Sequence, residues 1–167
     1  MAQEIVSRSG AAAWFIRLGM RLARFTLSAG WFVLRPVTFG VRGIPVTSDG
    51  RIVLIRHSYA PGWHFPGGGR KRDEDPRAAM LRELREEIGM TAHGEVSILG
   101  EYSHRPDFKH DTLAFFVIRD VAFTPRLSLE IEAIAAFPPD RLPPDITPAT
   151  ARRLAEWRGG APVAKRW

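Results

Sequence analysis

The sequence predicts a single α/β domain with an additional amphipathic helix in front of it. The chain has 167 residues, enough for one domain with a substantial core and too few for two comfortable ones. Strand-like apolar patterns alternate with helix-like ones, the latter at residues 10–34, 76–88 and 149–157. We therefore divide the chain into an N-terminal basic amphipathic helical segment (1–36), a main domain (37–158) and a C-terminal tail (159–167).

Composition limits the classes of protein to which the chain can belong. It is 45% hydrophobic and 25% charged, which is ordinary for a globular domain. It contains no cysteine, so disulfides, thiolate zinc sites and cysteine nucleophiles are excluded. This composition favours a cytoplasmic protein, with peripheral attachment to a membrane left open by the N-terminal segment.

The positive charge of the chain is unevenly placed. The net charge is +6, and no acidic residue lies between Ile5 and Thr47. Such a charge favours an anionic partner, which can be a nucleic acid, a membrane or a phosphorylated small molecule. No zinc finger, helix-turn-helix or aromatic RNA-binding signature accompanies it. We therefore expect a small-molecule substrate and no nucleic acid polymer.

The N-terminal helix pattern, residues 10–34, has a basic stripe beside a wide apolar surface. Arg17, Arg21 and Arg24 share one face, and bulky apolar residues occupy much of the remainder. Three interpretations stay open: packing on the domain or on a second subunit of a homodimer, attachment to a membrane interface, and a targeting segment. The uncharged run over residues 25–34 is far shorter than the roughly 20 residues that span a bilayer, so we expect no transmembrane helix.

A predicted hairpin leads into a glycine-rich loop. Apolar residues alternate from residue 37 to residue 46, Ser48-Asp49-Gly50 is a turn signal, and an apolar run follows at residues 52–55. The next segment, residues 61–69, holds two prolines and four glycines. That composition precludes regular structure and lets a ligand approach the backbone closely.

The helix predicted for residues 76–88 carries three carboxylates on one face. Its capping signals are Asp75, Pro76 and Gly89. Its apolar stripe is Leu81, Leu84 and Ile88, and almost opposite lie Glu83, Glu86 and Glu87. Like charges at this spacing repel by roughly a few tenths of a kcal/mol per pair unless a cation offsets them. Oxygen ligands beside a tight turn suit Mg²⁺ or Mn²⁺.

Together these residues resemble a complete Nudix box. From Gly68 the spacing runs through five residues to Glu74, then through seven to Arg82-Glu83-Leu84-x-Glu86-Glu87-x-Gly89-Met90. All the defining positions agree, and the resemblance extends over residues 37–158. It implies an α/β/α sandwich around a mixed sheet, and hydrolysis of nucleoside diphosphates linked to another moiety.

The resemblance also implies roles for individual residues. Glu83, Glu86 and Glu87 would be metal ligands, joined by the carbonyl of Gly67 or Gly68, and Arg82 would pair with Glu74 to orient the box. A bound divalent metal lowers the pKa of a water molecule, and a carboxylate accepts the water's proton. The identity of that base is left open between Glu83 and later carboxylates, which in order of preference start with Glu130 and include Glu132, Asp107 and Asp111.

Predicted substrate contacts surround the loop. Tyr59, Trp63, His64 and Phe65 precede the glycines, where an aromatic ring can stack on a nucleobase. Core packing is the alternative for each of them. Arg70 begins an unusually basic stretch, residues 70–72, which can contact phosphate or be solvated.

The leading hypothesis is Mg²⁺- or Mn²⁺-dependent hydrolysis of a pyrophosphate bond in a nucleoside diphosphate derivative, with ADP-ribose-like compounds and nucleoside triphosphates first. Two alternatives stay open. One is a Nudix-fold protein that senses a nucleotide without cleaving it, against which the intact carboxylate set argues. The other is a membrane-associated hydrolase of lipid-linked or isoprenoid diphosphates, which rests on the N-terminal helix alone.

Overall fold

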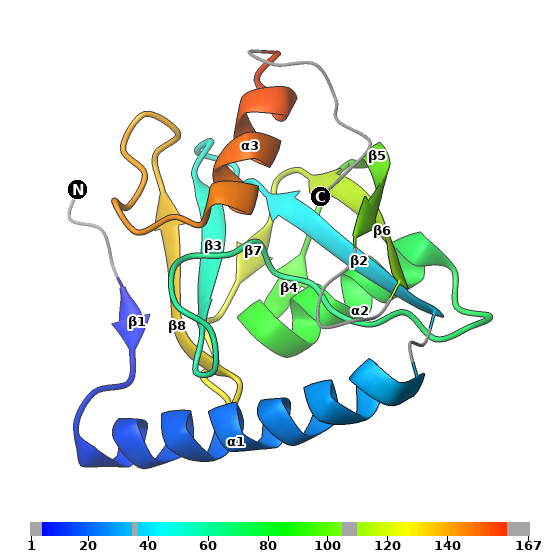
Figure 1. Cartoon of the computed structure of the whole chain (residues 1–167). Helices are drawn as coiled ribbons and strands as arrows, with labels where there is room; N and C mark the ends of the chain where they lie inside the picture. The colour runs from blue at the N-terminus through cyan, green and yellow to red at the C-terminus, as the bar shows by residue number, and fades with distance from the viewer. Residues whose placement is uncertain (1–4, 35–36, 105–109, 160–167) are drawn as a thin grey trace.

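The computed structural model describes residues 5–34, 37–104 and 110–159, with only the backbone described at residues 24, 26–34, 37, 104, 110 and 111. Within these ranges helices and strands are mixed, as the sequence predicts (Figure 1). The helices are α1 (Ala11–Leu34), α2 (Pro76–Ile88) and α3 (Pro148–Trp157). The strands are β1 (Val6–Ser7), β2 (Val37–Pro45), β3 (Ile52–His57), β4 (Met90–Ala92), β5 (Val96–His104), β6 (His110–Ile118), β7 (Ala122–Phe123) and β8 (Ile131–Phe137).

Two three-stranded sheets organise most of the described strands. In the mixed sheet, ordered β2-β6-β5, β2 runs parallel to β6 and β5 runs antiparallel to it. In the other sheet, ordered β1-β8-β3, both pairs are antiparallel. Parallel neighbours need a long crossover. Here the crossover from β2 to β6 contains β3, α2, β4 and β5.

One sequence prediction is wrong, because β2 and β3 do not form a hairpin ladder. The turn is present: the Thr47 N–H donates to the Arg51 carbonyl at 2.9 Å, and Val46 forms an isolated bridge with Ile52. Beyond it β2 pairs along its whole length with β6, whereas β3 pairs with β8. β3 is buried along nearly its whole length, so it needs a place in a sheet that is covered on both sides.

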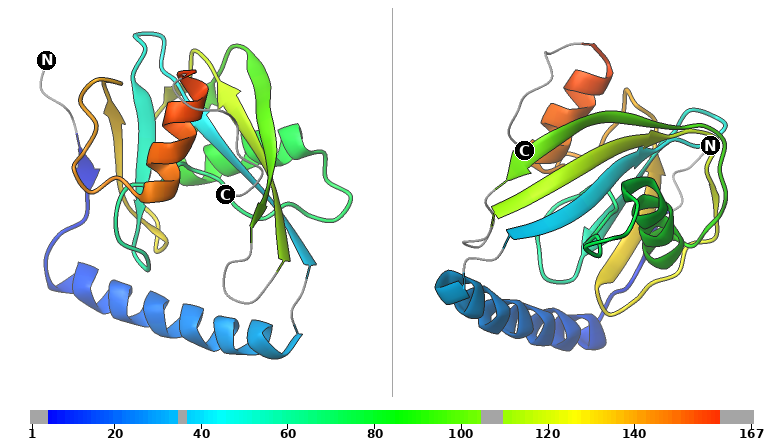
Figure 2. Two further views of the ribbon diagram at one scale, coloured as in Figure 1. Left: turned by 45° about the horizontal axis from the view of Figure 1, so that its top comes forward. Right: turned by 90° about the vertical axis from the view of Figure 1, so that its right-hand side faces the viewer.

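The apolar side chains of β6 show how both faces of the mixed sheet are covered. Leu113, Phe115 and Val117 pack in a cluster that includes Leu154 of α3, while the alternate residues pack in a second cluster with Leu84 of α2. Successive side chains of a strand point to opposite faces, so the two helices lie on opposite sides of the sheet (Figure 2). The predicted α/β/α sandwich is confirmed.

α3 is fastened to the domain by buried polar contacts as well as by Leu154. The Arg153 guanidinium lies 2.8 Å from the Glu156 carboxylate, and the Tyr102 hydroxyl donates to the same carboxylate at 2.9 Å. Burial and the neighbouring carboxylate raise the pKa of Tyr102 to about 12. A buried ion pair and hydrogen bond of this kind favour one arrangement, so they help to hold α3 on the sheet.

The predicted N-terminal helix is present as α1 and runs along the outside of the domain (Figures 1 and 2). It follows β1, which pairs with β8, so residues 6–7 of the N-terminal segment belong to a sheet of the main domain. Arg17 forms an ion pair with Glu132 of β8 at 2.6 Å. No helix in the described part of the chain is long and apolar enough to cross a membrane.

Candidate active site

The glycine-rich loop lies in an extended conformation against β2. The Val41 N–H donates to the Gly68 carbonyl at 2.9 Å, and the Arg70 N–H donates to the Phe39 carbonyl at 2.9 Å. Gly67 has a φ of 139°, and a Cβ atom built there would collide with the Val41 carbonyl oxygen. Glycine is therefore required at this position, because it alone tolerates both the backbone angle and the close approach.

α2 is placed beside this loop by its two ends. The Asp75 side chain accepts a hydrogen bond from the Ala78 N–H, Pro76 occupies the first turn, and Gly89 ends the helix with a left-handed φ of 70°. These are the predicted caps. Asp75 and Gly89 form hydrogen bonds with backbone groups at the helix ends that would otherwise be unpaired, and Pro76 has no N–H that needs a partner. Between them the apolar side, with Leu84 and Ile88 fully buried, packs on the sheet. The opposite side consequently faces the loop.

Two of the three predicted metal ligands contact the loop directly. The Glu87 carboxylate accepts a hydrogen bond from the Gly67 N–H at 2.7 Å. The Glu83 carboxylate is buried against Gly68, where a Cβ atom would lie only 2.6 Å from its Oε2 atom. Glu86, whose side chain is 58% exposed, lies at the outer edge of the same face.

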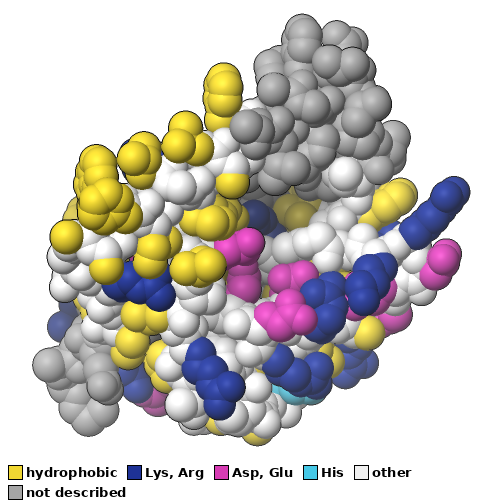
Figure 3. Space-filling model, turned by 90° about the horizontal axis from the view of Figure 1, so that it is seen from below, with side chains coloured by type: hydrophobic (Ala, Val, Ile, Leu, Met, Phe, Trp, Pro, Cys, Tyr) yellow, Lys and Arg dark blue, Asp and Glu magenta, His cyan; other side chains and the backbone are white. Residues whose placement is uncertain are grey.

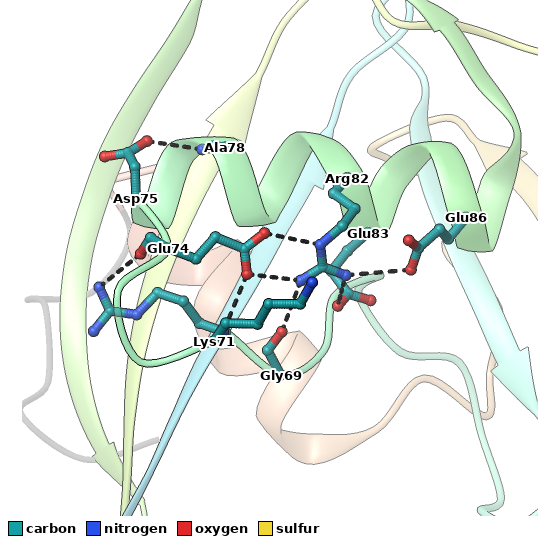
Figure 4. A network of polar contacts seen from close by, with 9 residues as sticks. Gly69, Lys71, Glu74, Asp75, Ala78, Arg82, Glu83 and Glu86 are labelled. Carbon is teal, nitrogen blue, oxygen red and sulfur yellow. Dashed lines mark hydrogen bonds and ion pairs between the residues drawn. The ribbon is translucent and has the colours of Figure 1, made fainter.

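Arg82 links the glycine-rich loop, Glu74 just before the helix cap, and the carboxylate face (Figure 4). Its guanidinium donates to both carboxylate oxygens of Glu74 at 2.8 and 3.0 Å, and to the Gly69 carbonyl at 3.0 Å. It also donates to Glu83 at 2.7 Å and to Glu86 at 3.2 Å. These bonds lower the pKa of Glu74 to about 2 and raise that of Arg82. The planar, multiply donating guanidinium suits this position, which a lysine could not fill.

The electrostatics of the two inner glutamates favour a bound cation. Burial raises the pKa of Glu87 to about 8, and the negative charges of Glu83 and Glu130 raise it further. The Gly67 N–H and the charge of Arg42 act in the opposite direction and lower it. Burial also raises the pKa of Glu83, although Arg82 opposes the rise. Carboxylates that resist ionisation in this way are stabilised when a positive ion is bound beside them. The donor set therefore fits a hard divalent cation, which prefers oxygen ligands.

The side chains are not yet arranged as a coordination shell. Among the described residues, no three carboxylate or histidine side chains converge in a geometry that would hold a metal. The reason lies in their hydrogen bonds. The carboxylates of Glu83 and Glu86 accept from Arg82, whereas the carboxylate of Glu87 accepts from the Gly67 N–H. A cation would have to compete with these hydrogen bonds for the carboxylates.

A cavity of about 760 Å³ opens beside the loop. Gly67 and Gly68 border it, so it adjoins the backbone that Glu83 and Glu87 contact, although no described carboxylate lines it. Its positive charge comes from Arg42, Arg70 and Arg72. A pocket with cationic walls beside a carboxylate face can hold the phosphates of a ligand between its arginines and a metal.

With this geometry established, comparison with known proteins identifies the family. The model of the NUDIX domain matches residues 37–157, most of the chain. The chain belongs to the NUDIX family. Its structure is similar to the crystal structure of a MutT NUDIX hydrolase from Burkholderia pseudomallei, with a TM-score of 0.62 and 28% identity over 72% of this chain and 97% of that one. It also shares its fold with a UDP-X diphosphatase, with a TM-score of 0.55 and 21% identity over 74% of this chain and 64% of that one.

Curated relatives match over shorter segments. An RNA pyrophosphohydrolase of Methylococcus capsulatus is 51% identical over 49 residues, which are 29% of this chain and 26% of the relative. An 8-oxo-dGTP diphosphatase of Proteus vulgaris is 40% identical over 58 residues, 35% of this chain and 51% of the relative. The match thus spans from a quarter to a half of the length of these two relatives.

Two of the five predicted substrate residues of this NUDIX domain line the cavity, namely Tyr59 and Arg70. The Tyr59 ring stacks on His57 at 4.8 Å, and the Arg70 guanidinium lies 4.9 Å from the centre of the Phe39 ring. Trp63 and Phe65 are only 3% and 1% exposed, because they pack on Phe137 and Phe115 in the core. The His64 ring is hydrogen-bonded to the Pro61 carbonyl. The last three do not line the cavity, so the core-packing alternative describes both aromatic residues.

Other lining residues were missed by the sequence reasoning. Phe39, Arg42 and Leu113 reach the cavity from β2 and β6, which are distant in sequence and meet through parallel pairing. Arg42 also donates to the Phe65 carbonyl at 2.8 Å. An arginine inside an apolar strand pattern is the one signal that could have indicated it.

The candidate bases occupy different surroundings. Glu132 is buried and paired with Arg17, so it faces α1. Glu130 is exposed, and its charge reaches Glu87. Asp107 and the side chain of Asp111 lie outside the described residues.

Proposed function

We propose that this protein hydrolyses a pyrophosphate bond of a nucleotide-type substrate with the help of Mg²⁺ or Mn²⁺. The observation that carries the proposal is the contact of Glu83 and Glu87 with the Gly67-Gly68 backbone, where burial raises both pKa values. A strongly perturbed carboxylate pair beside a cavity is a functional-site signature. Family membership and the names of the relatives support the same class of reaction.

In this proposal Glu83, Glu86 and Glu87 hold the cation together with a backbone carbonyl. Gly67 is the better candidate for that carbonyl, because no described residue donates to it, whereas the Gly68 carbonyl accepts the Val41 N–H. When bound, the cation supplies charge neutralisation at the phosphates and a water of lowered pKa. In this proposal Arg82 and Glu74 do not contact the cation. They hold the loop and the carboxylate face in fixed positions relative to each other.

Glu130 is the proposed general base. It is exposed, it carries no ion pair among the described residues, and its negative charge raises the pKa of Glu87. Glu83 is less suited, because Arg82 occupies one of its oxygens. A base must reach the proton that it accepts, and the charge interaction of Glu130 with Glu87 supports this assignment.

The proposed substrate places its phosphates beside Arg42, Arg70 and Arg72 and its base or sugar beside Tyr59. ADP-ribose-like compounds and nucleoside triphosphates remain the leading classes. The relatives named RNA pyrophosphohydrolase extend the second class to an RNA with a 5′-triphosphate end. This would overturn the expectation that no nucleic acid polymer is a partner, so such an RNA belongs in any test.

A hydrolase of isoprenoid or other lipid-linked diphosphates is the second candidate. Its support is the row of large apolar side chains that α1 leaves exposed. The division of the chain at residues 36 and 158, a cytoplasmic location and a homodimer remain proposals that rest on the sequence alone.

The test is a substrate panel with matched variants. The full chain is incubated with Mg²⁺ and, separately, ADP-ribose, nucleoside triphosphates, 5′-triphosphorylated RNA and isoprenoid diphosphates, and products are separated by chromatography. We expect hydrolysis of at least one substrate, its loss with a chelator, and its loss in Glu86→Gln and Glu87→Gln. Each loss should exceed the roughly 10–100-fold cost of changing an outer partner of a metal site.

Glu95→Gln is the control, because Glu95 is a highly exposed glutamate outside the site. Full activity of both site variants, or activity in the chelator, would contradict the mechanism. Saturable binding of a nucleotide by calorimetry, with no turnover of any compound, would favour the nucleotide sensor instead.

A further inference from the structure

The two sides of α1 have opposite surroundings. The side toward the domain carries Ala13, which is buried, and Ile16, Arg17 and Met20, which are half-buried. The outer side carries five large apolar side chains that are between 44% and 73% exposed, namely Trp14, Phe15, Leu18, Leu22 and Phe25. At 100° per residue these five fall within an arc of about 100°. We call them the outer stripe.

The outer stripe is a continuous surface. Figure 3 shows hydrophobic side chains in a row along one border of the molecule, next to a hollow in which acidic side chains gather. The Trp14 and Phe15 rings contact each other edge to face, with their centres 5.0 Å apart. Scattered exposed apolar residues are ordinary, but a contiguous apolar row on one helix indicates a binding surface.

Polar contacts fix the helix in this orientation. The Arg17 guanidinium binds both oxygens of Glu132, at 2.6 and 3.2 Å, and Glu132 is itself buried. Just before the helix, the Arg8 side chain donates to the Ser128 carbonyl at 3.1 Å. Rotating α1 to cover the outer stripe would break the Arg17 pair and leave a buried carboxylate alone, which is costly.

Charge decides which partner fits this surface. No acidic residue lies between Ile5 and Thr47. Arg21 is exposed at the edge of the outer stripe, and it makes no ion pair in the described part of the chain. An antiparallel two-fold pairing of α1 with a second copy would bring the arginine edges of both helices together without carboxylates to offset them. An anionic lipid surface offers both an apolar layer for the aromatic rings and phosphate groups for the arginines.

We propose that the outer stripe of α1 lies in the interface of an anionic lipid bilayer, with Arg21 at the level of the lipid phosphates. The helix has 24 residues, so it would lie along the surface for about 36 Å. The rest of the described molecule lies on one side of α1 (Figures 1 and 2), and the side chains of the outer stripe are exposed, so the domain does not obstruct this contact. The proposal concerns α1 alone and does not depend on the proposed hydrolysis.

The test is sedimentation of the full chain with lipid vesicles, either neutral phosphatidylcholine or the same lipid with about a third phosphatidylglycerol. We expect binding to the anionic vesicles and a fall of about tenfold or more in the double variant Phe15→Gln/Leu22→Gln, because the lost apolar contact dominates interfacial binding. Arg21→Gln should weaken binding to anionic vesicles by about fivefold. It should leave binding to neutral vesicles unchanged.

Ile98→Gln is the matched control, since Ile98 of β5 is as exposed as Leu22 but lies away from α1. It should bind vesicles like the unaltered chain, and circular dichroism should show that every variant is folded. The proposal is overturned if the unaltered chain does not sediment with anionic vesicles, or if the double variant sediments equally well. It is also overturned if ultracentrifugation shows a dimer that the double variant dissociates while neither protein binds vesicles.

Discussion

Two amphipathic helices of this protein, α2 and α1, use their apolar sides in opposite ways. α2 buries Leu84 and Ile88 against the sheet and turns its carboxylates to the glycine loop. α1 turns Ala13, Arg17 and Met20 to the domain and leaves the large apolar residues of the outer stripe exposed. An apolar stripe alone therefore does not show which way a helix faces. The orientation is set by the polar contacts on the opposite side of the helix. On α1 that contact is the ion pair of Arg17 with Glu132 of the same chain.

The test with the largest expected effect makes the same change, leucine to alanine, once on each helix. Leu84 of α2 is fully buried, whereas Leu22 of α1 is 59% exposed. Leu84→Ala should reduce the free energy of unfolding by about 2–5 kcal/mol, because it opens a cavity in the core. Leu22→Ala should change it by no more than about 0.5 kcal/mol. Chemical denaturation of both variants measures this, and equal losses would mean that α1 is packed by its apolar side.

The next test concerns the arginine that joins α2 to the loop. Arg82→Lys should lower the rate of hydrolysis by about 10–100-fold, the typical cost of losing an outer partner of a metal site. Lysine keeps the charge but cannot reach Glu74, Gly69 and Glu83 at once. Arg85→Lys, on the exposed side of the same helix, is the control and should leave the rate unchanged. The measurement is the steady-state rate of each variant at saturating Mg²⁺. Equal rates for the two variants would show that Arg82 has no role in the site.

The third test concerns the dependence of stability on pH. The folded protein raises the pKa of Glu87 from its ordinary 4.5 to about 8, so the fold holds this proton more tightly than the unfolded chain does. The resulting contribution to stability is complete below pH 4.5 and is lost as the pH rises through about 8. In a chelator, the melting temperature of the unaltered chain should fall across this range.

The variant Glu87→Gln isolates the contribution of this one group. It cannot ionise, so its melting temperature should fall less between about pH 5 and pH 8 than that of the unaltered chain. Saturating Mg²⁺ should reduce the fall in the unaltered chain, because the cation stabilises the ionised carboxylate. Parallel curves for the two proteins in the chelator would show that Glu87 ionises normally.

Local signals predicted the parts of the fold that depend on neighbours in sequence. Asp75, Pro76 and Gly89 act within one turn of the chain, and the bounds of α2 follow from them. The contact of Arg82 with Glu74 likewise joins residues eight positions apart. The family resemblance supplied that pairing, and helical counting placed the three glutamates on one face.

Features that depend on distant pairing could not be predicted. Phe39 and Arg42 reach the cavity because β2 lies parallel to β6, about which the sequence of β2 carries no information. The sequence leaves Trp63 and Phe65 open between substrate contact and core packing, because it cannot show the bridge of Trp63 to Ile146 or the packing of Phe65 on Phe115 that place them in the core. The outward side of α1 likewise depends on Glu132, more than a hundred residues away.

The start of β8 ties two of these features together. Glu130 and Glu132 flank Ile131, and their surroundings differ completely: one is exposed with its charge reaching Glu87, the other is buried under Arg17. A strand shifted by one residue turns every side chain to its other face. A slip of one residue in the pairing of β8 with β3 would therefore turn Glu132 away from Arg17 and move Glu130 relative to the site in the same step.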